Sequence, residues 1–135
     1  MSAPRVLIAE DDPASLELVQ VYLESKGYRV SAALDGNRAL EMGGTGEFDV
    51  MIMDVHMPVY GGLEVLQMLR KRLLRHPIKV IALTADARLI LRDELRRDGV
   101  DSYLTKPVSL AQLGQEVKRL LASDKAPPDP ALPAA

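Results

Sequence analysis

The sequence predicts an α/β fold: a single (βα)5 domain with a doubly wound parallel sheet and helices on both faces. Five short apolar runs rich in β-branched residues are typical of strands, and stretches with helical spacing follow them. Alternating strands and helices form right-handed βαβ units, and small chains of this kind commonly use the strand order 2-1-3-4-5. The 135 residues suffice for one hydrophobic core but not for a second domain of ordinary size.

The expected strands cover residues 6–9, 28–33, 48–53, 78–83 and 100–104. The first, third and fourth are apolar nearly throughout and do not alternate with polar residues. Such runs are typical of central parallel strands that are buried on both faces. We therefore expect these three strands in the middle of the sheet.

The first two helices are delimited by residues that start or stop helices. Asp12 is expected to cap the first helix, with Pro13 at its first position, and Gly27 to end it. The second helix should be short, around residues 37–42, because two glycines follow it. Asp35, beside an edge strand, is left out of the candidate site.

The remaining helices are expected at about residues 62–75, 87–98 and from Ser109, which stands in capping-box spacing with Gln112. Apolar residues at helical spacing mark the buried faces: Leu16, Val19, Leu23, Leu63, Leu66, Leu73, Leu110, Leu113, Val117 and Leu120. We expect residues 1–123 to form the domain. Residues 124–135 contain four prolines and should be a disordered tail or the stub of a linker.

The composition excludes several classes of function. A formal net charge of -2 gives no positive field to favour nucleic acid or a membrane surface. The absence of cysteine excludes disulfides, thiolate metal sites and a cysteine nucleophile. No signal-peptide pattern opens the chain, and no apolar run approaches membrane-spanning length. We expect a cytoplasmic protein that binds neither nucleic acid directly nor membranes.

Polar residues follow the predicted strands where they end. Glu10 and Asp11 follow the first strand, Asp54 the third and Thr84 the fourth, and Lys106 comes just after the fifth. In open parallel sheets, ligands bind at this edge, where the strand order reverses.

Carboxylates that converge at one edge repel each other unless a cation lies among them. Oxygen ligands without histidine or thiolate favour Mg²⁺, with Mn²⁺ as the alternative, and leave coordination positions to water and phosphate. Lysine can pair with a carboxylate or a phosphoryl oxygen, and a threonine hydroxyl can hydrogen-bond a phosphoryl group. These residue types together are those of an aspartyl-phosphate site.

Four segments carry a resemblance to a known family: Val6–Asp12, Asp54–Pro58 followed by Gly62-Leu63, Ala82–Ala85 and Tyr103–Pro107. In their order and spacing they resemble the motifs of response-regulator receiver domains of two-component signalling, of the CheY-like superfamily with its flavodoxin-like fold. The match covers about residues 5–122. Each motif alone is weak, and the set is specific.

The resemblance implies that Asp54 attacks a phosphohistidine donor and becomes the acyl phosphate. Asp11, Asp54 and the backbone carbonyl of His56 would bind Mg²⁺, and Glu10 would act mainly through a metal-bound water. Lys106 would contact the phosphoryl group and the Asp54 carboxylate.

The resemblance also implies a switch. Thr84 and Ala85 would bind the phosphoryl group, and Tyr103 would turn inward when Thr84 moves. Asp86, together with His56, would tune the phosphoryl lifetime. A cis peptide is expected before Pro107. One departure from the family is Gly61-Gly62, where a carboxylate cap of the third helix is often found.

The expected donor is a histidine kinase or a histidine phosphotransfer protein. The expected output is a surface of helix four, strand five and helix five that binds a downstream protein or a second copy of the chain. In residues 89–91 at least one of three apolar side chains should be exposed, either as part of that surface or as an isolated residue. Whether the chain is a free regulator or a receiver from a hybrid kinase stays open.

Other functions fit less well. A Mg²⁺-dependent phosphohydrolase of the haloacid-dehalogenase type needs a second acid two residues after its nucleophile, and Pro13 stands two after Asp11. A flavin or dinucleotide site needs a glycine- or hydroxyl-rich loop where this chain has three acids. A binding scaffold independent of phosphorylation would not require the full set of site residues. We therefore expect a regulatory phosphoacceptor that catalyses only its own phosphorylation and dephosphorylation.

Overall fold

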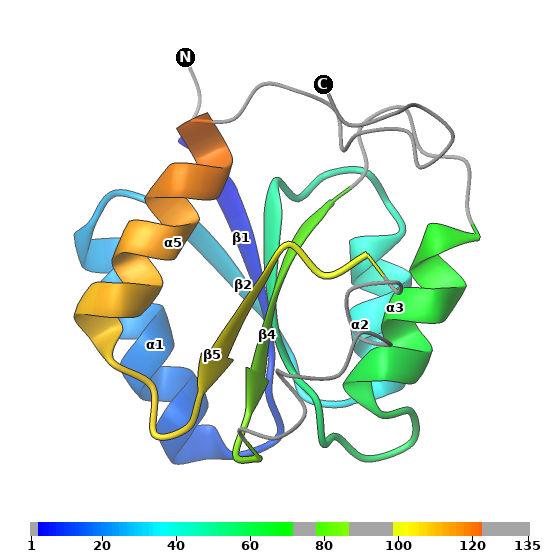
Figure 1. The fold of residues 1–135 in the computed structure, drawn as a ribbon. Coiled ribbons are helices and arrows are strands. Elements are labelled where there is room, and N and C mark those ends of the chain that lie inside the picture. The colour runs from blue at the N-terminus through cyan, green and yellow to red at the C-terminus, as the bar shows by residue number, and fades with distance from the viewer. Residues whose placement is uncertain (1–2, 72–77, 87–98, 123–135) are drawn as a thin grey trace, which may run out of the picture.

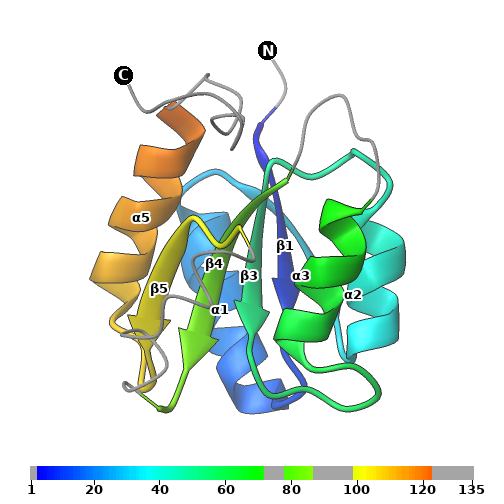
Figure 2. The same cartoon turned by 45° about the vertical axis from the view of Figure 1, so that its right-hand side comes forward.

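The computed structural model describes residues 3–71, 78–86 and 99–122. Five strands form one parallel sheet in the order β2-β1-β3-β4-β5, which confirms the predicted topology. In Figure 2 the arrowheads of β3, β4 and β5 point to the same edge. The strands are β1 Arg5–Ala9, β2 Arg29–Ala33, β3 Val50–Asp54, β4 Lys79–Thr84 and β5 Ser102–Thr105.

The described helices are α1 Pro13–Ser25, α2 Gly36–Gly43, α3 Gly62–Arg70 and α5 Leu110–Ala122. The predicted fourth helix, its apolar residues 89–91 and the predicted tail at 124–135 lie outside the described residues. Within the described part of the chain, no helix has both the length and the apolar character needed to cross a bilayer.

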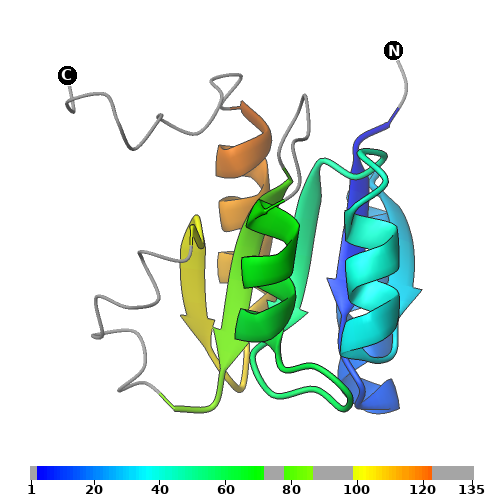
Figure 3. The ribbon, with the colours of Figure 1, turned by 90° about the vertical axis from the view of Figure 1, so that its right-hand side faces the viewer.

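The sheet separates two layers of helices. Helices α1 and α5 lie on one side of it, and α2 and α3 lie on the other (Figure 1). Figure 3, seen from the second side, shows α2 in front of β1 and beside α3. Alternate residues of β1 face the two sides, because Val6 and Ile8 pack in the core under α1 and α5, whereas Leu7 and Ala9 pack under α2 and α3. The central strands are thus covered on both faces, as predicted.

The buried helix faces follow the predicted spacing in part, and the largest difference is in α3. Five of the expected residues of α1 and α5 are buried: Val19, Leu23, Leu113, Val117 and Leu120. Leu16 and Leu110 are only partly buried, and Leu73 lies outside the described residues. In α3 the buried side chains are Val65, Leu66 and Leu69, while Leu63 is only partly buried. This face is spaced i, i+3, i+4, i+7 from Gly62, which contacts the sheet where α3 begins.

The starts of α1 and α5 agree with the expected caps, and Asp35 caps α2, where no cap was predicted. Asp12 and Asp35 each accept a hydrogen bond from the amide three residues later, at 3.1 and 2.9 Å. Ser109 accepts the corresponding bond at 3.3 Å. Gly61, at the start of α3, supplies no side-chain cap. The loss of a carboxylate cap at this helix, predicted from the sequence, is confirmed.

Candidate functional site

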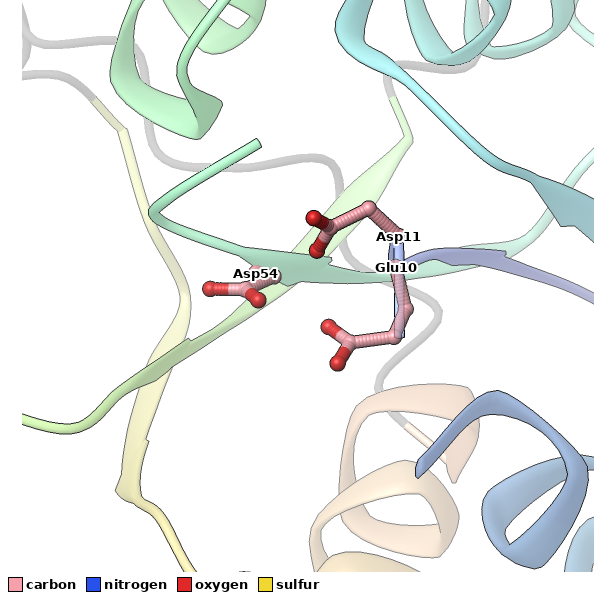
Figure 4. A group of neighbouring side chains, drawn as sticks. All are labelled: Glu10, Asp11 and Asp54. Atoms are coloured by element: carbon pink, nitrogen blue, oxygen red, sulfur yellow. The ribbon is translucent and has the colours of Figure 1, made fainter. Parts of the chain in front are cut away.

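Three carboxylates meet where β1 and β3 lie side by side. Ala9, the last residue of β1, is in register with Met53, so the acids that follow them are neighbours. One oxygen each of Glu10, Asp11 and Asp54 lies within 4.8 Å of the others. Figure 4 shows Glu10 and Asp11 projecting from the end of β1 beside Asp54. The sequence predicted this convergence.

Lys106 crosses the sheet edge to reach two of these acids. Its backbone N–H donates to the Thr84 carbonyl at 2.8 Å, which holds the chain after β5 against the end of β4. Its Nζ donates to Glu10 Oε1 at 2.8 Å and to Asp54 Oδ2 at 2.9 Å. The peptide bond between Lys106 and Pro107 is cis, as the resemblance implied. One cation therefore neutralises part of the charge of two carboxylates.

Glu10 is the more deeply buried of the two acids that Lys106 contacts. Only 3% of the residue is exposed, and its Oε2 has no hydrogen-bond partner among the described residues. Burial, followed by the neighbouring Asp54 carboxylate, raises the pKa of Glu10 to about 7, although Lys106 acts in the opposite direction. Glu10 therefore changes between its protonated and ionised forms near neutral pH in the metal-free protein.

Asp54 behaves in the opposite way. Burial alone would raise its pKa, but interactions with Glu10, with the His56 amide and with Lys106 outweigh burial and lower it. The His56 N–H donates to Asp54 Oδ1 at 2.9 Å. Burial would lower the pKa of Lys106, but the two carboxylates outweigh it and raise that pKa. Asp54 is thus an ionised carboxylate beside an ammonium group at neutral pH.

The three acids could hold a divalent cation. All of their donor atoms are carboxylate oxygens, which is the ligand type that Mg²⁺ and Mn²⁺ prefer. Asp11 is exposed to solvent, and Glu10 has a buried oxygen without a hydrogen-bond partner among the residues that the structure describes. An incompletely satisfied acidic cluster at an accessible edge fits a hard cation that keeps some of its water.

The predicted switch residues lie at the end of β4 and in β5. Thr84 is buried, and its hydroxyl accepts the Asp86 N–H at 3.0 Å. Ala85, between them, is exposed. Tyr103 is half-buried and packs against the core on the α2–α3 side of the sheet. In this conformation the Thr84 hydroxyl is therefore hydrogen-bonded within its own loop, and Tyr103 belongs to the core.

Two glycines contact the loop after β3, and only one of them, Gly62, was singled out by the sequence analysis. A Cβ at Gly62 would lie 2.5 Å from the Asp54 carbonyl oxygen, and one at Gly36 would collide with the backbone of Tyr60. Gly36 also donates its N–H to the Pro58 carbonyl at 3.1 Å. The Asp35-Gly36 pair, separated from the end of β2 by one residue, was the available signal, but the edge position of that strand led us to leave Asp35 out of the site.

Comparisons with known proteins agree with the geometry. The family model described as response regulator receiver domain matches residues 6–118. The sensor histidine kinase GacS of Pseudomonas protegens is 42% identical over 118 residues, which cover 85% of this chain and 13% of the kinase. The chain thus spans a small part of that relative's length.

Two solved structures are similar over most of this chain. The receiver domain of sensor histidine kinase PA1611 from Pseudomonas aeruginosa, with a magnesium ion in its active site cleft, matches with a TM-score of 0.81 and 30% identity, over 90% of this chain and 100% of that one. The receiver domain of Ssk1 from Saccharomyces cerevisiae, in complex with the phosphotransfer protein Ypd1, matches with a TM-score of 0.82 and 25% identity, over 95% and 94%. The fold, the site and the family match together show that this chain belongs to the response regulator receiver domains of two-component signalling.

Proposed function

We propose that this chain is a cytoplasmic phosphoacceptor that takes a phosphoryl group from phosphohistidine onto Asp54. The observation that carries the proposal is the environment of Asp54, an ionised carboxylate at the end of a buried strand with Lys106 at 2.9 Å. A carboxylate with a lowered pKa keeps its lone pair available at neutral pH, so it can act as a nucleophile.

In the transfer step, an oxygen of Asp54 forms a bond to phosphorus while the P–N bond of the donor phosphohistidine breaks. The leaving imidazole takes up a proton. Lys106 is held where it can neutralise charge on the transferred group, which is the role of lysine in phosphoryl transfer. Thr84 would leave its bond to the Asp86 amide and donate its hydroxyl to a phosphoryl oxygen, with Ala85 beside it. Tyr103 would then turn inward.

Glu10, Asp11, Asp54 and the backbone carbonyl of His56 would bind Mg²⁺. The cation would offset repulsion between the carboxylates and the incoming phosphoryl group and orient that group. Glu10 would act mainly through a metal-bound water, which suits its buried oxygen, since that oxygen has no hydrogen-bond partner in the described part of the chain. Asp86 and His56 would tune how long the phosphoryl group survives.

The donor would be a histidine kinase or a histidine phosphotransfer protein, as the named relatives suggest. Exposed apolar side chains on α1 suggest where it docks. Leu18 and Val21 are 56% and 61% exposed. Leu18 also lines a cavity of about 130 Å³ together with Glu10 and Lys106, so the apolar surface of α1 is continuous with the site. A donor that reaches Asp54 would cover this surface.

The domain would comprise residues 1–123, and its output surface would include β5 and α5 together with the region between β4 and β5. It would act on a downstream protein or a second copy of the chain, as a regulator and not as an enzyme with an external substrate. Residues 124–135 would be a tail or a linker stub.

The proposal is tested by intact-protein mass after incubation with acetyl phosphate. One phosphoryl group should add in Mg²⁺ and none in EDTA. Asp54→Asn should abolish the adduct, and Asp49→Asn, at the opposite edge of the sheet, should keep it. If both variants keep the adduct, the phosphoacceptor is a residue other than Asp54. If the wild type forms no adduct, the result favours a binding scaffold.

A further inference from the structure

The loop between β3 and α3 carries the His56 carbonyl and is fixed at its first end by three hydrogen bonds. Val55 N–H donates to the Leu83 carbonyl of β4 at 3.0 Å, and the Gly62 N–H donates to the Val55 carbonyl at 2.8 Å. His56 N–H donates to Asp54 at 2.9 Å. These bonds determine where the peptide unit before His56 lies.

The other end of the loop, after His56, is held by a second set of hydrogen bonds. There the Pro58 carbonyl accepts N–H groups from Tyr60, at 2.9 Å, and from Gly36, at 3.1 Å. Gly36 is the first residue of α2, far from the loop in sequence and buried against it. A Cβ at residue 36 would lie 2.7 Å from the Tyr60 Cβ and would collide with the Tyr60 carbonyl. Only glycine allows this close approach.

The loop is strained where Gly36 contacts it. The bond from Tyr60 to Pro58 closes a three-residue turn around Val59, whose φ is +70°. This is the geometry of the rare γ-turn, and a β-branched residue disfavours positive φ. Val59 is also 71% exposed, so packing of its own side chain does not compensate. Contacts elsewhere must hold the turn, and Gly36 supplies one of them.

We infer that Gly36 is a positioning residue for the metal site, because its contact with Pro58 and Tyr60 holds the loop in the conformation that presents the His56 carbonyl. The inference rests on the proposed function, in which that carbonyl is a metal ligand. It extends the site to the β2–α2 connection, on an edge strand that contributes no ligand.

The test compares Gly36→Ala with Gly43→Ala. Both glycines lie in α2 and are buried, but the atoms nearest to a Cβ at Gly43 belong to side chains of the core, those of Leu69 at 3.3 Å and Leu7 at 3.8 Å. Mg²⁺ affinity is measured by titration followed by NMR, and stability by urea denaturation in EDTA. Gly36→Ala should weaken Mg²⁺ binding roughly tenfold, the lower end of what loss of support for a metal ligand costs. Gly43→Ala should bind Mg²⁺ within about twofold of the wild type, whatever its stability.

A purely structural role for Gly36 would change the urea midpoint and leave Mg²⁺ affinity unaltered, and that result would overturn the inference alone. Absence of Mg²⁺ binding to the wild type would overturn the proposed metal site and this inference together. If Gly36→Ala does not fold, the inference is tested by hydrogen exchange on the wild type. Saturation with Mg²⁺ should then slow hydrogen exchange at the Gly36 amide and not at Gly43. Equal exchange at Gly36 with and without Mg²⁺ would refute the coupling.

Discussion

Replacing Glu10 with glutamine should remove most of the pH dependence of stability between pH 5 and pH 8. In the metal-free protein, the pKa of Glu10 rises from 4.5 to about 7. Between these values the folded protein binds more protons than the unfolded chain, so the free energy of unfolding falls as pH rises. A difference of roughly 2.5 pKa units corresponds to about 3 kcal/mol, an order-of-magnitude value.

Asp54 does not disturb this window. Its pKa lies below the usual range, so the stability that it contributes is lost only when pH falls well below 5. The assay is urea denaturation in EDTA at pH 5 and pH 8. From pH 5 to pH 8 the free energy of unfolding of the wild type should fall by up to about 3 kcal/mol. That of Glu10→Gln should fall much less, because the glutamine amide does not titrate. Equal losses would refute the reasoning.

A control variant and the metal sharpen the assay. Glu24→Gln removes an exposed acid on α1 and should keep the wild-type pH dependence. Saturating Mg²⁺ should restore stability to the wild type at pH 8, because a bound cation stabilises the ionised form of Glu10 and releases its proton. If Mg²⁺ binds but stabilises the protein equally at pH 5 and pH 8, Glu10 does not belong to the metal site.

Three further predictions concern other parts of the chain. Leu18→Ala should slow phosphoryl transfer from a phosphohistidine protein about tenfold more than transfer from acetyl phosphate, because burial of a leucine contributes on the order of 1.5 kcal/mol or more. Equal slowing of both reactions in stopped-flow assays would contradict docking on α1. Arg70→Met should lower the free energy of unfolding by about 2–3 kcal/mol, since Arg70 donates to the carbonyls of Ile78 and Gly99 and pairs with Asp101 at 3.7 Å; an unchanged urea midpoint would show that these bonds add nothing. Val59→Gly should raise stability by up to about 1 kcal/mol by relieving positive φ; a lower melting temperature would contradict strain at that turn.

Features that depend on local sequence were predictable. Asp12 and Pro13 mark the start of α1 through their own side chains, and the all-apolar central strands follow from burial on both faces. The acidic cluster followed from one rule, that ligands bind at the carboxyl edge of a parallel sheet. The residues of this cluster could therefore be identified from the sequence without knowing the distances between them.

Features that depend on long-range contacts were not predictable. The close approach of α2 to the loop after β3 depends on how two connections meet in space, and nothing in the local sequence around Gly36 specifies its partner Pro58. The raised pKa of Glu10 likewise results from burial and from Asp54, 44 residues away in the sequence. For α3, the start at Gly62 and the burial of Leu66 were predicted correctly. The burial of Val65 and Leu69 instead of Leu63 was not, because it depends on which face of the helix packs against the sheet.

The most direct test of the central claim is chemical identification of the phosphorylated residue. Borohydride reduces an acyl phosphate of aspartate to homoserine, so the protein is incubated with a phosphohistidine donor and Mg²⁺, treated with borohydride and sequenced by mass spectrometry. Homoserine at position 54, absent when EDTA replaces Mg²⁺, is the expected result. Homoserine at Asp11 or Asp12, or phosphate on a residue outside the cluster, would contradict the assignment of Asp54 as the phosphoacceptor.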